Sequence, residues 1–274
     1  MRPSEVLRRG ADYLSRHGID SAQVEAEALM MSVLACDRAH LYSTVEPLTG
    51  DQARTFGRAL CQRCEGTPLQ HLTGSQGFRE LELTVRPGVF IPRPETESVV
   101  ERALEHLGHE PSLALDIGTG TGAIALSLKS ARPAAEVHAV DISEAALDLA
   151  ADNARRLGLD VSFHLGDTYD ALPEGLRGRI DLVASNPPYV TTEEYLDLPP
   201  EVLADPVAAL VGEPDVYRRL VAGAGSWLKP SGWLVVEIGA SQGSEVAEVF
   251  AESLSDVAVL KDLAGRDRIV EGRR

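Results

Sequence analysis

Residues 113–123 read Leu113-Ala114-Leu115-Asp116-Ile117-Gly118-Thr119-Gly120-Thr121-Gly122-Ala123, and the apolar residues Ile124-Ala125-Leu126 follow. The apolar run predicts a buried strand, and the glycine-rich segment predicts a tight loop that leads into a helix. Glycines there permit a sharp turn and let a ligand approach the main chain where a Cβ atom would collide. The stretch therefore indicates a nucleotide-binding loop at the carboxyl end of a strand.

From residue 113 onward, short apolar runs alternate with helical segments, which is typical of a mostly parallel sheet with helices on both faces. We expect an α/β fold with seven strands, near residues 113–117, 136–141, 160–165, 181–185, 233–238, 258–263 and 268–271. Helices are expected to fill most of the gaps between them.

The N-terminal part has a different character. Residues 4–17, 22–35 and 52–64 have apolar positions at helical spacing, which predicts a small helical bundle. Ser4 and either Asp20 or Ser21 are candidate helix caps. Residues 81–86 alternate as a strand does, and Pro87-Gly88 is typical of a turn. We therefore expect a helical domain at 1–75, a hairpin linker at 76–94 and the α/β domain at 95–274.

The composition is that of a globular protein without a membrane span. Hydrophobic residues make up 44% and charged residues 25% of the 274 positions, and no apolar run is long enough to cross a bilayer. The charged N-terminus lacks the apolar core of a secretion signal, so we expect a cytoplasmic protein. Its three cysteines, Cys36, Cys61 and Cys64, favour neither a disulfide framework nor a four-ligand zinc site, and no metal is expected.

The negative charge is concentrated in the α/β part. Residues 1–80 hold 9 Lys and Arg against 10 Asp and Glu, so the 26 and 42 of the whole chain leave 17 against 32 for residues 81–274. Such a field repels a phosphate backbone, and neutralising phosphates supplies most non-specific affinity for nucleic acids. Direct binding to nucleic acid is therefore not expected.

Acidic residues recur where three successive predicted strands end. Asp116 lies two residues before the first loop glycine, where it would repel a pyrophosphate but can engage an ammonium group or an ordered water. Asp141 can accept both hydroxyls of a ribose, and Asp167 can accept the exocyclic amine of adenine. An ammonium-bearing tail, a ribose and adenine without a phosphate describe S-adenosylmethionine.

Other interpretations of these residues remain open. Gly118, Gly120 and Ala123 also satisfy the spacing of a dinucleotide-binding loop, which would indicate an NAD-dependent oxidoreductase. Each carboxylate alone can be a helix cap or a solvated loop charge, but the three together favour S-adenosylmethionine. The expected cofactor-binding residues are Asp116, Gly118, Thr119, Gly120, Thr121, Gly122, Asp141, Asp167, Thr168 and Asn186.

The fourth strand leads to Asn186-Pro187-Pro188-Tyr189 at the same sheet edge. A polar amide, two prolines that fix the main chain and an aromatic ring can form a rigid, acceptor-lined pocket for a planar NH2 group. The simpler alternative is a turn that ends a strand. The motif resembles that of class I methyltransferases acting on planar NH2 groups.

A second block of sequence narrows this resemblance. Two segments are similar to the signature of the release-factor glutamine N5-methyltransferase family. They are residues 68–74, Pro-Leu-Gln-His-Leu-Thr-Gly, and residues 88–97, Gly-Val-Phe-Ile-Pro-Arg-Pro-Glu-Thr-Glu. The similarity continues through Glu237-Ile238-Gly239, Gln242 and residues 265–268. It implies the seven-stranded class I methyltransferase fold, S-adenosylmethionine as methyl donor with S-adenosylhomocysteine as product, and the Gly-Gly-Gln loop glutamine of class 1 peptide chain release factors as substrate.

The implied site centres on Asn186, Pro187, Pro188 and Tyr189 as catalytic and substrate-binding residues. An amide nitrogen is a poor nucleophile, and acceptance of its two N–H groups by the Asn186 side-chain oxygen and the Pro187 carbonyl would orient it and stabilise developing positive charge. Pro188 would keep the main chain rigid, and Tyr189 would pack beside the glutamine. Four further residues are expected to close the cofactor pocket or organise its entrance, with helix capping as the alternative for the last two: Phe90, Arg93, Glu95 and Thr96.

One position departs from the family. Many members carry an aromatic residue that stacks on adenine where this chain has Thr168, and Tyr169 is the candidate substitute. The main alternative function is an amino methyltransferase acting on adenine or cytosine in nucleic acid, which needs the same kind of pocket and a flipped base. A non-catalytic cofactor-binding protein is a second alternative. We expect a monomer.

Overall fold

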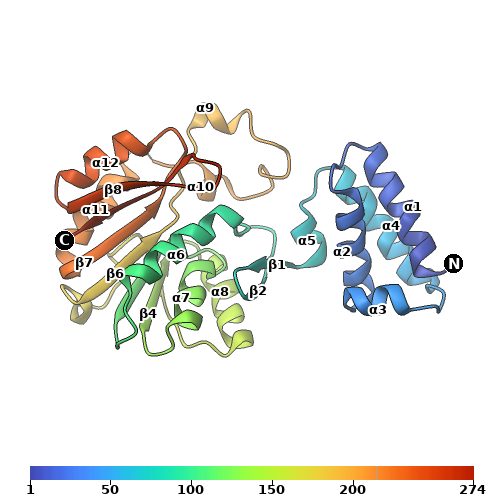
Figure 1. Ribbon diagram of the computed structural model, residues 1–274, viewed down its shortest axis with the longest axis horizontal. Coiled ribbons are helices and arrows are strands. Elements are labelled where there is room, and N and C mark those ends of the chain that lie inside the picture. The colour runs from blue at the N-terminus through green and yellow to red at the C-terminus, as the bar shows by residue number, and fades with distance from the viewer. Residues whose placement is uncertain (214) are drawn as a thin grey trace. The chain divides into compact units, whose positions relative to one another are not determined.

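The computed structural model describes residues 1–213 and 215–274. The chain forms two compact units (Figure 1). The first contains Met1–Ser75 together with Pro199–Ala204, and the second contains Gln76–Leu198 together with Asp205–Arg274. A short segment that follows the Asn186 motif in sequence thus belongs to the first unit.

The first unit is a bundle of helices. Its helices are α1 (Pro3–Arg16), α2 (Ala22–Leu34), α3 (Arg38–Ser43), α4 (Gly50–Cys64) and α5 (Leu69–Thr73). The core includes Leu14, Leu29 and Met30, and Phe56 of α4 packs so close to Gly10 of α1 that a Cβ atom there would lie 2.7 Å from its ring. The three predicted helices are confirmed, whereas α3 and α5 are too short to show a helical period in the sequence.

The helix caps differ in part from the expected ones. Ser4 lies inside α1, because the helix begins at Pro3, whose missing N–H costs nothing in the first turn. Ser21 occupies the cap position of α2, but its hydroxyl donates to Glu25 instead of accepting from the helix. Thr49 caps α4 through a full capping box, so this helix begins two residues before the expected start.

A buried ion pair joins the segments of the first unit. Arg63 of α4 donates to Glu25 of α2 at 2.6 Å and to Glu201 at 2.8 Å, and its side chain is only 9% exposed. Glu201 belongs to the segment Pro199–Ala204, so this pair attaches that segment to the helices.

The second unit is built on a seven-stranded sheet, which confirms the predicted fold class. Its strands are β3 (Leu113–Ile117), β4 (Glu136–Asp141), β5 (Ser162–Leu165), β6 (Ile180–Ser185), β7 (Leu228–Glu237), β8 (Ser255–Lys261) and β9 (Asp267–Arg273). Their order is β5-β4-β3-β6-β7-β9-β8, and β9 runs antiparallel to the other six strands. The chain reverses its direction of travel across the sheet between β3 and β6, and ligands of open α/β sheets bind at such a point.

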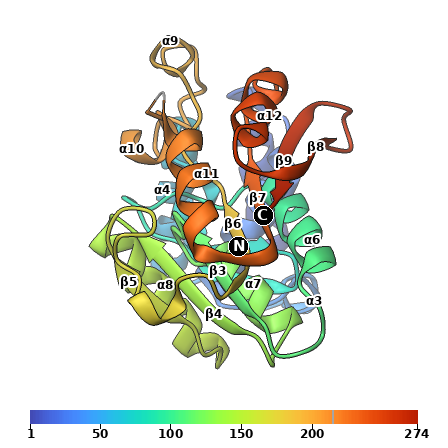
Figure 2. The same cartoon turned by 90° about the vertical axis from the view of Figure 1, so that its left-hand side faces the viewer.

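Helices cover both faces of this sheet (Figure 2). The helices of this unit are α6 (Glu97–His106), α7 (Ala123–Ala131), α8 (Glu144–Leu157), α9 (Thr192–Tyr195), α10 (Val207–Leu210), α11 (Val216–Trp227) and α12 (Gly243–Ala251). Two short strands, β1 (Ser75–Phe78) and β2 (Leu81–Thr84), form a separate two-stranded sheet. The 3-10 turns are η1 (Pro94–Thr96) and η2 (Glu174–Leu176).

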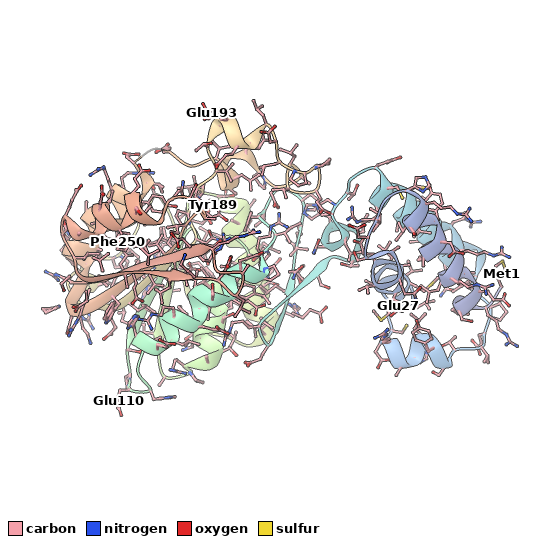
Figure 3. All side chains as sticks on the ribbon, turned by 45° about the horizontal axis from the view of Figure 1, so that its top comes forward. Met1, Glu27, Glu110, Tyr189, Glu193 and Phe250 are labelled. Carbon is pink, nitrogen blue, oxygen red and sulfur yellow. The ribbon has the colours of Figure 1, made fainter. Side chains whose placement is uncertain are left out.

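Alternate residues of each strand meet different helices, as a pleated sheet requires. Ala114 faces the core formed with α6, α7 and α8, whereas Leu115 faces the core formed with α11 and α12. Phe250 of α12, labelled in Figure 3, is fully buried in the second core. Burial on both faces explains why these strands read as continuous apolar runs.

No helix within residues 1–213 and 215–274 has the length and apolar character needed to cross a membrane.

Candidate active site

The carboxyl ends of five neighbouring strands present a row of polar side chains. In sheet order, Asp167 follows β5, Asp141 ends β4, Asp116 lies in β3, Asn186 follows β6 and Glu237 ends β7. Ser185 of β6 is paired with Val236 of β7, which places Asn186 beside Glu237. Parallel strands thus bring residues from distant parts of the sequence to one edge.

The loop between β3 and α7 adopts the backbone conformation that its glycines allow. Gly118, Gly120 and Gly122 all have positive φ angles, of 74°, 57° and 87°. A side chain is strained in this region, so each glycine serves the shape of the turn. A Cβ atom at Gly122 would also lie 2.9 Å from Leu126 of α7, because the loop packs tightly onto the helix that follows.

Asp116 stabilises this loop through hydrogen bonds of its carboxylate. Its Oδ2 accepts the Thr119 hydroxyl at 2.6 Å and the Ala125 N–H at 3.1 Å, while its Oδ1 is buried and has no donor among the described residues. Burial raises the pKa of Asp116 to about 7 despite these two hydrogen bonds. A positive group near Oδ1 would favour the charged form, so the site suits a cation better than a phosphate.

Asp141 is joined to the same loop. Its Oδ2 accepts the Gly120 N–H at 2.8 Å, and its Oδ1 accepts the Ser143 N–H at 2.9 Å at the start of α8. Burial raises the pKa of Asp141, and these main-chain N–H groups oppose the rise. Each carboxylate oxygen has two lone pairs, so both can accept a further hydroxyl proton.

The third acidic position is held by an arginine. Arg219 of α11 donates to Asp167 at 2.6 Å. Thr168 has a φ of 47°, unusual for a β-branched residue. The ring of Tyr169 is 4% exposed, stacks beside Trp227 and donates its hydroxyl to the Leu220 carbonyl. Tyr169 is therefore a core residue that is not placed to stack on a base.

These groups fit S-adenosylmethionine. The buried, unpartnered oxygen of Asp116 suits an ammonium group or a bridging water, and Asp141 has acceptor capacity for ribose hydroxyls. Asp167 presents a half-exposed carboxylate one strand further on. Acidic groups along the whole edge would repel the phosphates of a dinucleotide.

The Asn186 motif is fixed at its first residue. Asn186 Nδ2 donates to Thr96 Oγ1 at 3.0 Å, and Asn186 Oδ1 makes no hydrogen bond to the described residues. Ser185, directly before it, donates to the Ile117 carbonyl of β3 at 2.8 Å. Thr96 makes no capping hydrogen bond to α6, so its hydroxyl serves Asn186 and not the helix.

The remainder of the motif is held from two sides. Tyr189 donates its hydroxyl to Glu237 at 3.2 Å, and its carbonyl accepts from Gln242 at 3.0 Å. Burial raises the pKa of Tyr189, which keeps its hydroxyl protonated as a donor. The Gly212 N–H donates to the Val190 carbonyl at 3.1 Å, so the main chain after the motif is also attached.

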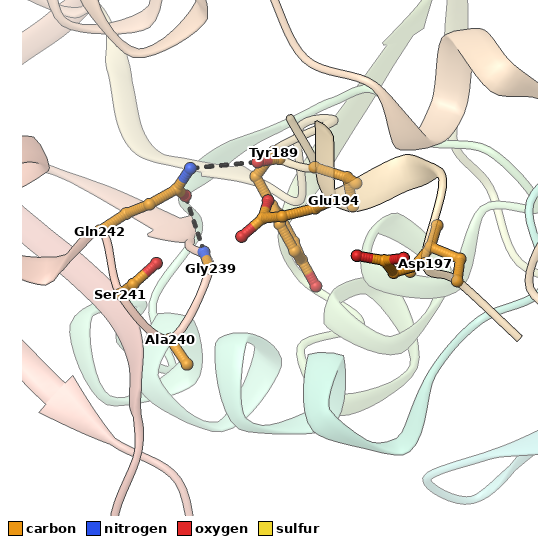
Figure 4. A pocket seen from close by; sticks show the side chains of 9 residues that line it. Tyr189, Glu194, Asp197, Gly239, Ala240, Ser241 and Gln242 are labelled. Atoms are coloured by element: carbon orange, nitrogen blue, oxygen red, sulfur yellow. Dashed lines mark hydrogen bonds between the residues drawn. The ribbon is translucent and has the colours of Figure 1, made fainter. Parts of the chain in front are cut away.

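A pocket of about 450 Å³ opens beside the motif (Figure 4). Tyr189 and Gln242 line one part of it, and the carboxylates of Glu194 and Asp197 reach it from the segment around α9. The turn after β7 supplies the remaining wall with Gly239, Ala240 and Ser241. The pocket thus joins the Asn186 motif to the surface.

The block around Phe90 is anchored by an aspartate distant in sequence. Asp205, whose side chain is fully buried, accepts the Ile91 N–H at 3.0 Å and forms an ion pair with Arg93. The Arg93 guanidinium lies 5.3 Å from the centre of the Phe90 ring. Glu95 makes no side-chain hydrogen bond within the described ranges, and its charge raises the pKa of Glu237. Of the four residues of this block named from the sequence, Thr96 is the one whose side chain has a hydrogen bond to the motif among the described residues.

Sequence reasoning missed three residues that support the site. Asp205 and Gly212 lie after the motif in sequence, and no sequence pattern around them indicates a role in the site. Asn153 of α8 is fully buried and donates to the Thr121 carbonyl at 3.1 Å, while its Oδ1 accepts the Thr84 N–H at 2.8 Å. A polar residue on the apolar face of a predicted helix is a signal that could have pointed to Asn153.

Family models and curated relatives match nearly the whole chain. Residues 5–74 match a model described as the PrmC N-terminal domain, and residues 80–265 match the methyltransferase small domain. Proteins called release factor glutamine methyltransferase are 42% identical in Xylella fastidiosa strain 9a5c, over 92% of this chain and 93% of the relative. Those of Cereibacter sphaeroides and Deinococcus radiodurans are 42% and 40% identical, each over 100% of this chain and 99% of the relative.

Solved structures share the fold at low identity. RsmC, a 16S rRNA methyltransferase of T. thermophilus solved with AdoMet and guanosine, superposes with a TM-score of 0.55 at 23% identity, over 73% of this chain and 49% of that one. The hMettl16 catalytic domain superposes with a TM-score of 0.57 at 13% identity, over 82% of each chain. At these identities the likeness concerns the fold alone.

Proposed function

The chain belongs to the release factor glutamine methyltransferase family, and we propose from this premise that it methylates N5 of the glutamine in the Gly-Gly-Gln motif of class 1 peptide chain release factors. It is an S-adenosylmethionine-dependent protein glutamine methyltransferase. Its action would tune translation termination.

The orientation of the Asn186 side-chain amide, with its NH2 group toward Thr96 and its oxygen free of hydrogen bonds to the described residues, is the observation that supports this proposal most. Its Nδ2 is engaged with Thr96, so Oδ1 is the part of the side chain left to accept a hydrogen bond. A primary amide substrate presents two N–H donors and needs acceptors of this kind. The Pro187 carbonyl would accept the second N–H.

The reaction follows from this arrangement. When bound, S-adenosylmethionine supplies an electrophilic sulfonium methyl group. Asn186 Oδ1 and the Pro187 carbonyl hold the substrate nitrogen in one orientation and stabilise the positive charge that it gains. The nitrogen then loses a proton to an acceptor or to water, so no strong base is required before attack. Pro188 restricts the main chain, and Tyr189 packs beside the glutamine.

We assign the cofactor to the loop and the acidic row. Asp116 would serve the ammonium group, directly or through water, Asp141 the ribose, and Asp167 with the adjoining Thr168 the adenine. Five residues of the loop would surround the cofactor, namely Gly118, Thr119, Gly120, Thr121 and Gly122. The block with Phe90, Arg93 and Glu95 would close the entrance.

The pocket beside Tyr189 is the proposed entrance for the substrate glutamine. It lies beside Tyr189 of the Asn186 motif, and its lining combines apolar residues such as Val190 and Leu198 with polar ones such as Glu194 and Gln242, as suits a peptide side chain. We assign residues 1–75 to docking of the release factor, 76–94 to a linker and 95–274 to catalysis. The protein is proposed to work as a monomer in the cytoplasm.

Isotope-labelled S-adenosylmethionine tests this function directly. The purified protein is incubated with a class 1 release factor or with duplex DNA, and the label is located by mass spectrometry. We expect the loop glutamine to gain the mass of one methyl group in place of a hydrogen. Asn186→Ala should nearly abolish transfer and leave cofactor affinity within about threefold, because the loss concerns the transition state. Label on DNA bases instead would establish the nucleic-acid alternative.

A further inference from the structure

Glu237 is a buried acid at the site to which the reaction above gives no role. It ends β7, is 1% exposed and lies on the strand beside the Asn186 motif. Its Oε1 accepts the Tyr189 hydroxyl at 3.2 Å. Its Oε2 is buried and has no donor at full hydrogen-bonding distance among the described residues. Burying a carboxyl group without hydrogen-bond partners costs free energy, so a buried glutamate of this kind calls for a structural or functional explanation.

The hydroxyl of Thr96 lies close to the Glu237 carboxyl. Thr96 is 4% exposed, and its hydrogen bonding to Glu237 lowers the pKa of that carboxyl. A threonine in a helical turn often donates to a carbonyl of the preceding turn, as Thr73 does to Leu69 at 3.2 Å. Within the described residues Thr96 has no such bond, so its proton is available to Glu237.

The direction of these hydrogen bonds fixes the Asn186 amide. Asn186 Nδ2 donates to Thr96 Oγ1, so the hydroxyl proton of Thr96 must point elsewhere. A carboxylate can only accept, and it therefore holds the proton on its own side and leaves an oxygen lone pair toward Asn186. A Thr96 hydroxyl turned the other way would donate to the amide oxygen and reverse the Asn186 side chain.

We propose that Glu237 and Thr96 are positioning residues that set the polarity of the Asn186 amide and keep its Oδ1 directed to the substrate nitrogen. This inference rests on the function proposed above, since it assigns the cause of the acceptor geometry that the reaction uses. Glu237 also holds Tyr189, so one carboxyl orders both ends of the motif.

The charge state of Glu237 gives the proposal a pH signature. Burial raises the pKa of Glu237 to about 7, against hydrogen bonding from Thr96 and Tyr189 and the charge of Arg268. The negative charge of Glu95 also raises the pKa of Glu237. The charge of Glu237 in turn raises the pKa of the nearby Tyr217. Below this pKa a protonated Glu237 can donate to Thr96, and the amide is no longer held in one polarity.

Variants of the two residues test the proposal in the full-length protein, with a class 1 release factor as methyl acceptor. At pH 8 and saturating cofactor, Glu237→Gln and Thr96→Val should each lower kcat about tenfold or more, because the acceptor is misplaced. The Kd for S-adenosylhomocysteine should stay within about threefold. Thr96→Ser, which keeps the hydroxyl, should restore most of the rate.

Two further measurements separate positioning from general damage. The double variant should be no slower than the slower single variant, because both act through one chain of hydrogen bonds. In wild type kcat should fall as the pH drops through about 7, and Glu237→Gln should remove this fall. Glu271→Gln is the matched control: it is a buried glutamate, also 1% exposed, on the neighbouring strand β9, and the variant should keep both kcat and its pH profile.

Wild-type kcat in Thr96→Val, or rate losses that multiply in the double variant, would overturn the proposal. A wild-type protein that transfers no methyl group to the release factor would instead refute the proposed function. The two failures are thus distinguishable in the same experiment.

Discussion

Gln242 donates its side-chain amide to the main-chain carbonyl of Tyr189 at 3.0 Å. The same side chain accepts the Gly239 N–H at 2.9 Å and the Tyr217 hydroxyl at 3.0 Å through its Oε1. One amide therefore joins the turn after β7, helix α11 and the end of the Asn186 motif. Its donor and acceptor functions serve different partners, so they can be tested separately.

We predict that Gln242→Glu lowers kcat more than it lowers stability. A carboxylate still accepts from Gly239 and Tyr217 but cannot donate to Tyr189, and it faces that carbonyl with negative charge. The lost hydrogen bond is worth about 1 kcal/mol, and the displaced loop should cost about tenfold in rate. Steady-state kinetics and thermal unfolding measure the two effects. Unchanged kcat would show that this contact does not shape the site.

Asp141→Ala is predicted to weaken cofactor binding. It removes the acceptors of the Gly120 and Ser143 N–H groups, and with them the acceptor that we propose for the ribose hydroxyls. Loss of a hydrogen bond to a charged group costs about 1.5–3 kcal/mol, which is roughly tenfold to a hundredfold in Kd. Calorimetry with S-adenosylhomocysteine measures the change, and Asp148→Ala, at an exposed position of helix α8 that follows Asp141 in sequence, is the control. Equal affinities for the two variants would contradict the assignment.

Asp205→Ala should disorder the block that carries Thr96. The substitution leaves the buried Ile91 N–H without its acceptor and Arg93 without its partner. An unsatisfied buried donor costs about 1–3 kcal/mol, so thermal unfolding should shift to lower temperature. Arg93→Met, which leaves the bond to Ile91 intact, should cost less. An equal loss in both variants would assign the stabilisation to the ion pair.

Asp205 also shows what the sequence could not reveal. The strands were predictable because parallel strands buried on both faces read as apolar runs. The positions of Asp116, Asp141 and Asp167 at the sheet edge were predictable because each lies at, or just after, the carboxyl end of such a run. Asp205 contacts a residue 114 positions away, and nothing near it in the sequence marks that partner. Its place depends on tertiary packing alone.

Thr96 and Tyr169 show the same limit on a smaller scale. Thr96 was recognised as a site residue or a helix cap, and only the structure shows its bond to Asn186. Tyr169 lies two residues after the acidic position Asp167. Thr168 between them has a left-handed backbone conformation, and the Tyr169 ring lies in the core. Local spacing indicates which residues are near an edge, whereas the direction of each side chain depends on the backbone at that residue.

Glu271 should contribute stability that is lost in acid. Burial would raise the pKa of Glu271, but hydrogen bonds from Arg102 and His106 outweigh it and lower the pKa to about 2. An unfolded glutamate titrates near pH 4.3, so the contribution is full above that value and disappears as the pH falls toward 2. It amounts to about 3 kcal/mol, from about 1.4 kcal/mol for each pKa unit.

Denaturant unfolding of wild type and Glu271→Gln between neutral and acidic pH checks this prediction. The difference in free energy of unfolding should be largest near neutrality and should shrink below pH 4.3 or so. Glu105→Gln, at the exposed partner of Arg102, should show a much smaller difference. A gap between wild type and Glu271→Gln that does not depend on pH would contradict the ionic origin.

Gly212 lies against the main chain of the Asn186 motif. A Cβ atom there would come within 2.1 Å of the Pro188 carbonyl oxygen and 3.3 Å of the Tyr189 Cα atom. The main chain cannot turn away easily, because Gly212 N–H donates to the Val190 carbonyl and Val190 N–H donates to the Leu210 carbonyl. A larger residue at 212 must therefore displace the motif itself.

Gly212→Ala is accordingly predicted to lower kcat by about tenfold to a hundredfold, since small displacements of a catalytic group have effects of that size. Cofactor affinity should change little, because the loop after β3 and Asp141 are not touched. Gly225→Ala in α11 is the matched control: its Cβ meets nothing within 4 Å, and alanine should stabilise the helix by about 0.5–1 kcal/mol. Kinetics and cofactor titration of both variants decide the matter, because equal rates would mean that the motif tolerates movement of its main chain.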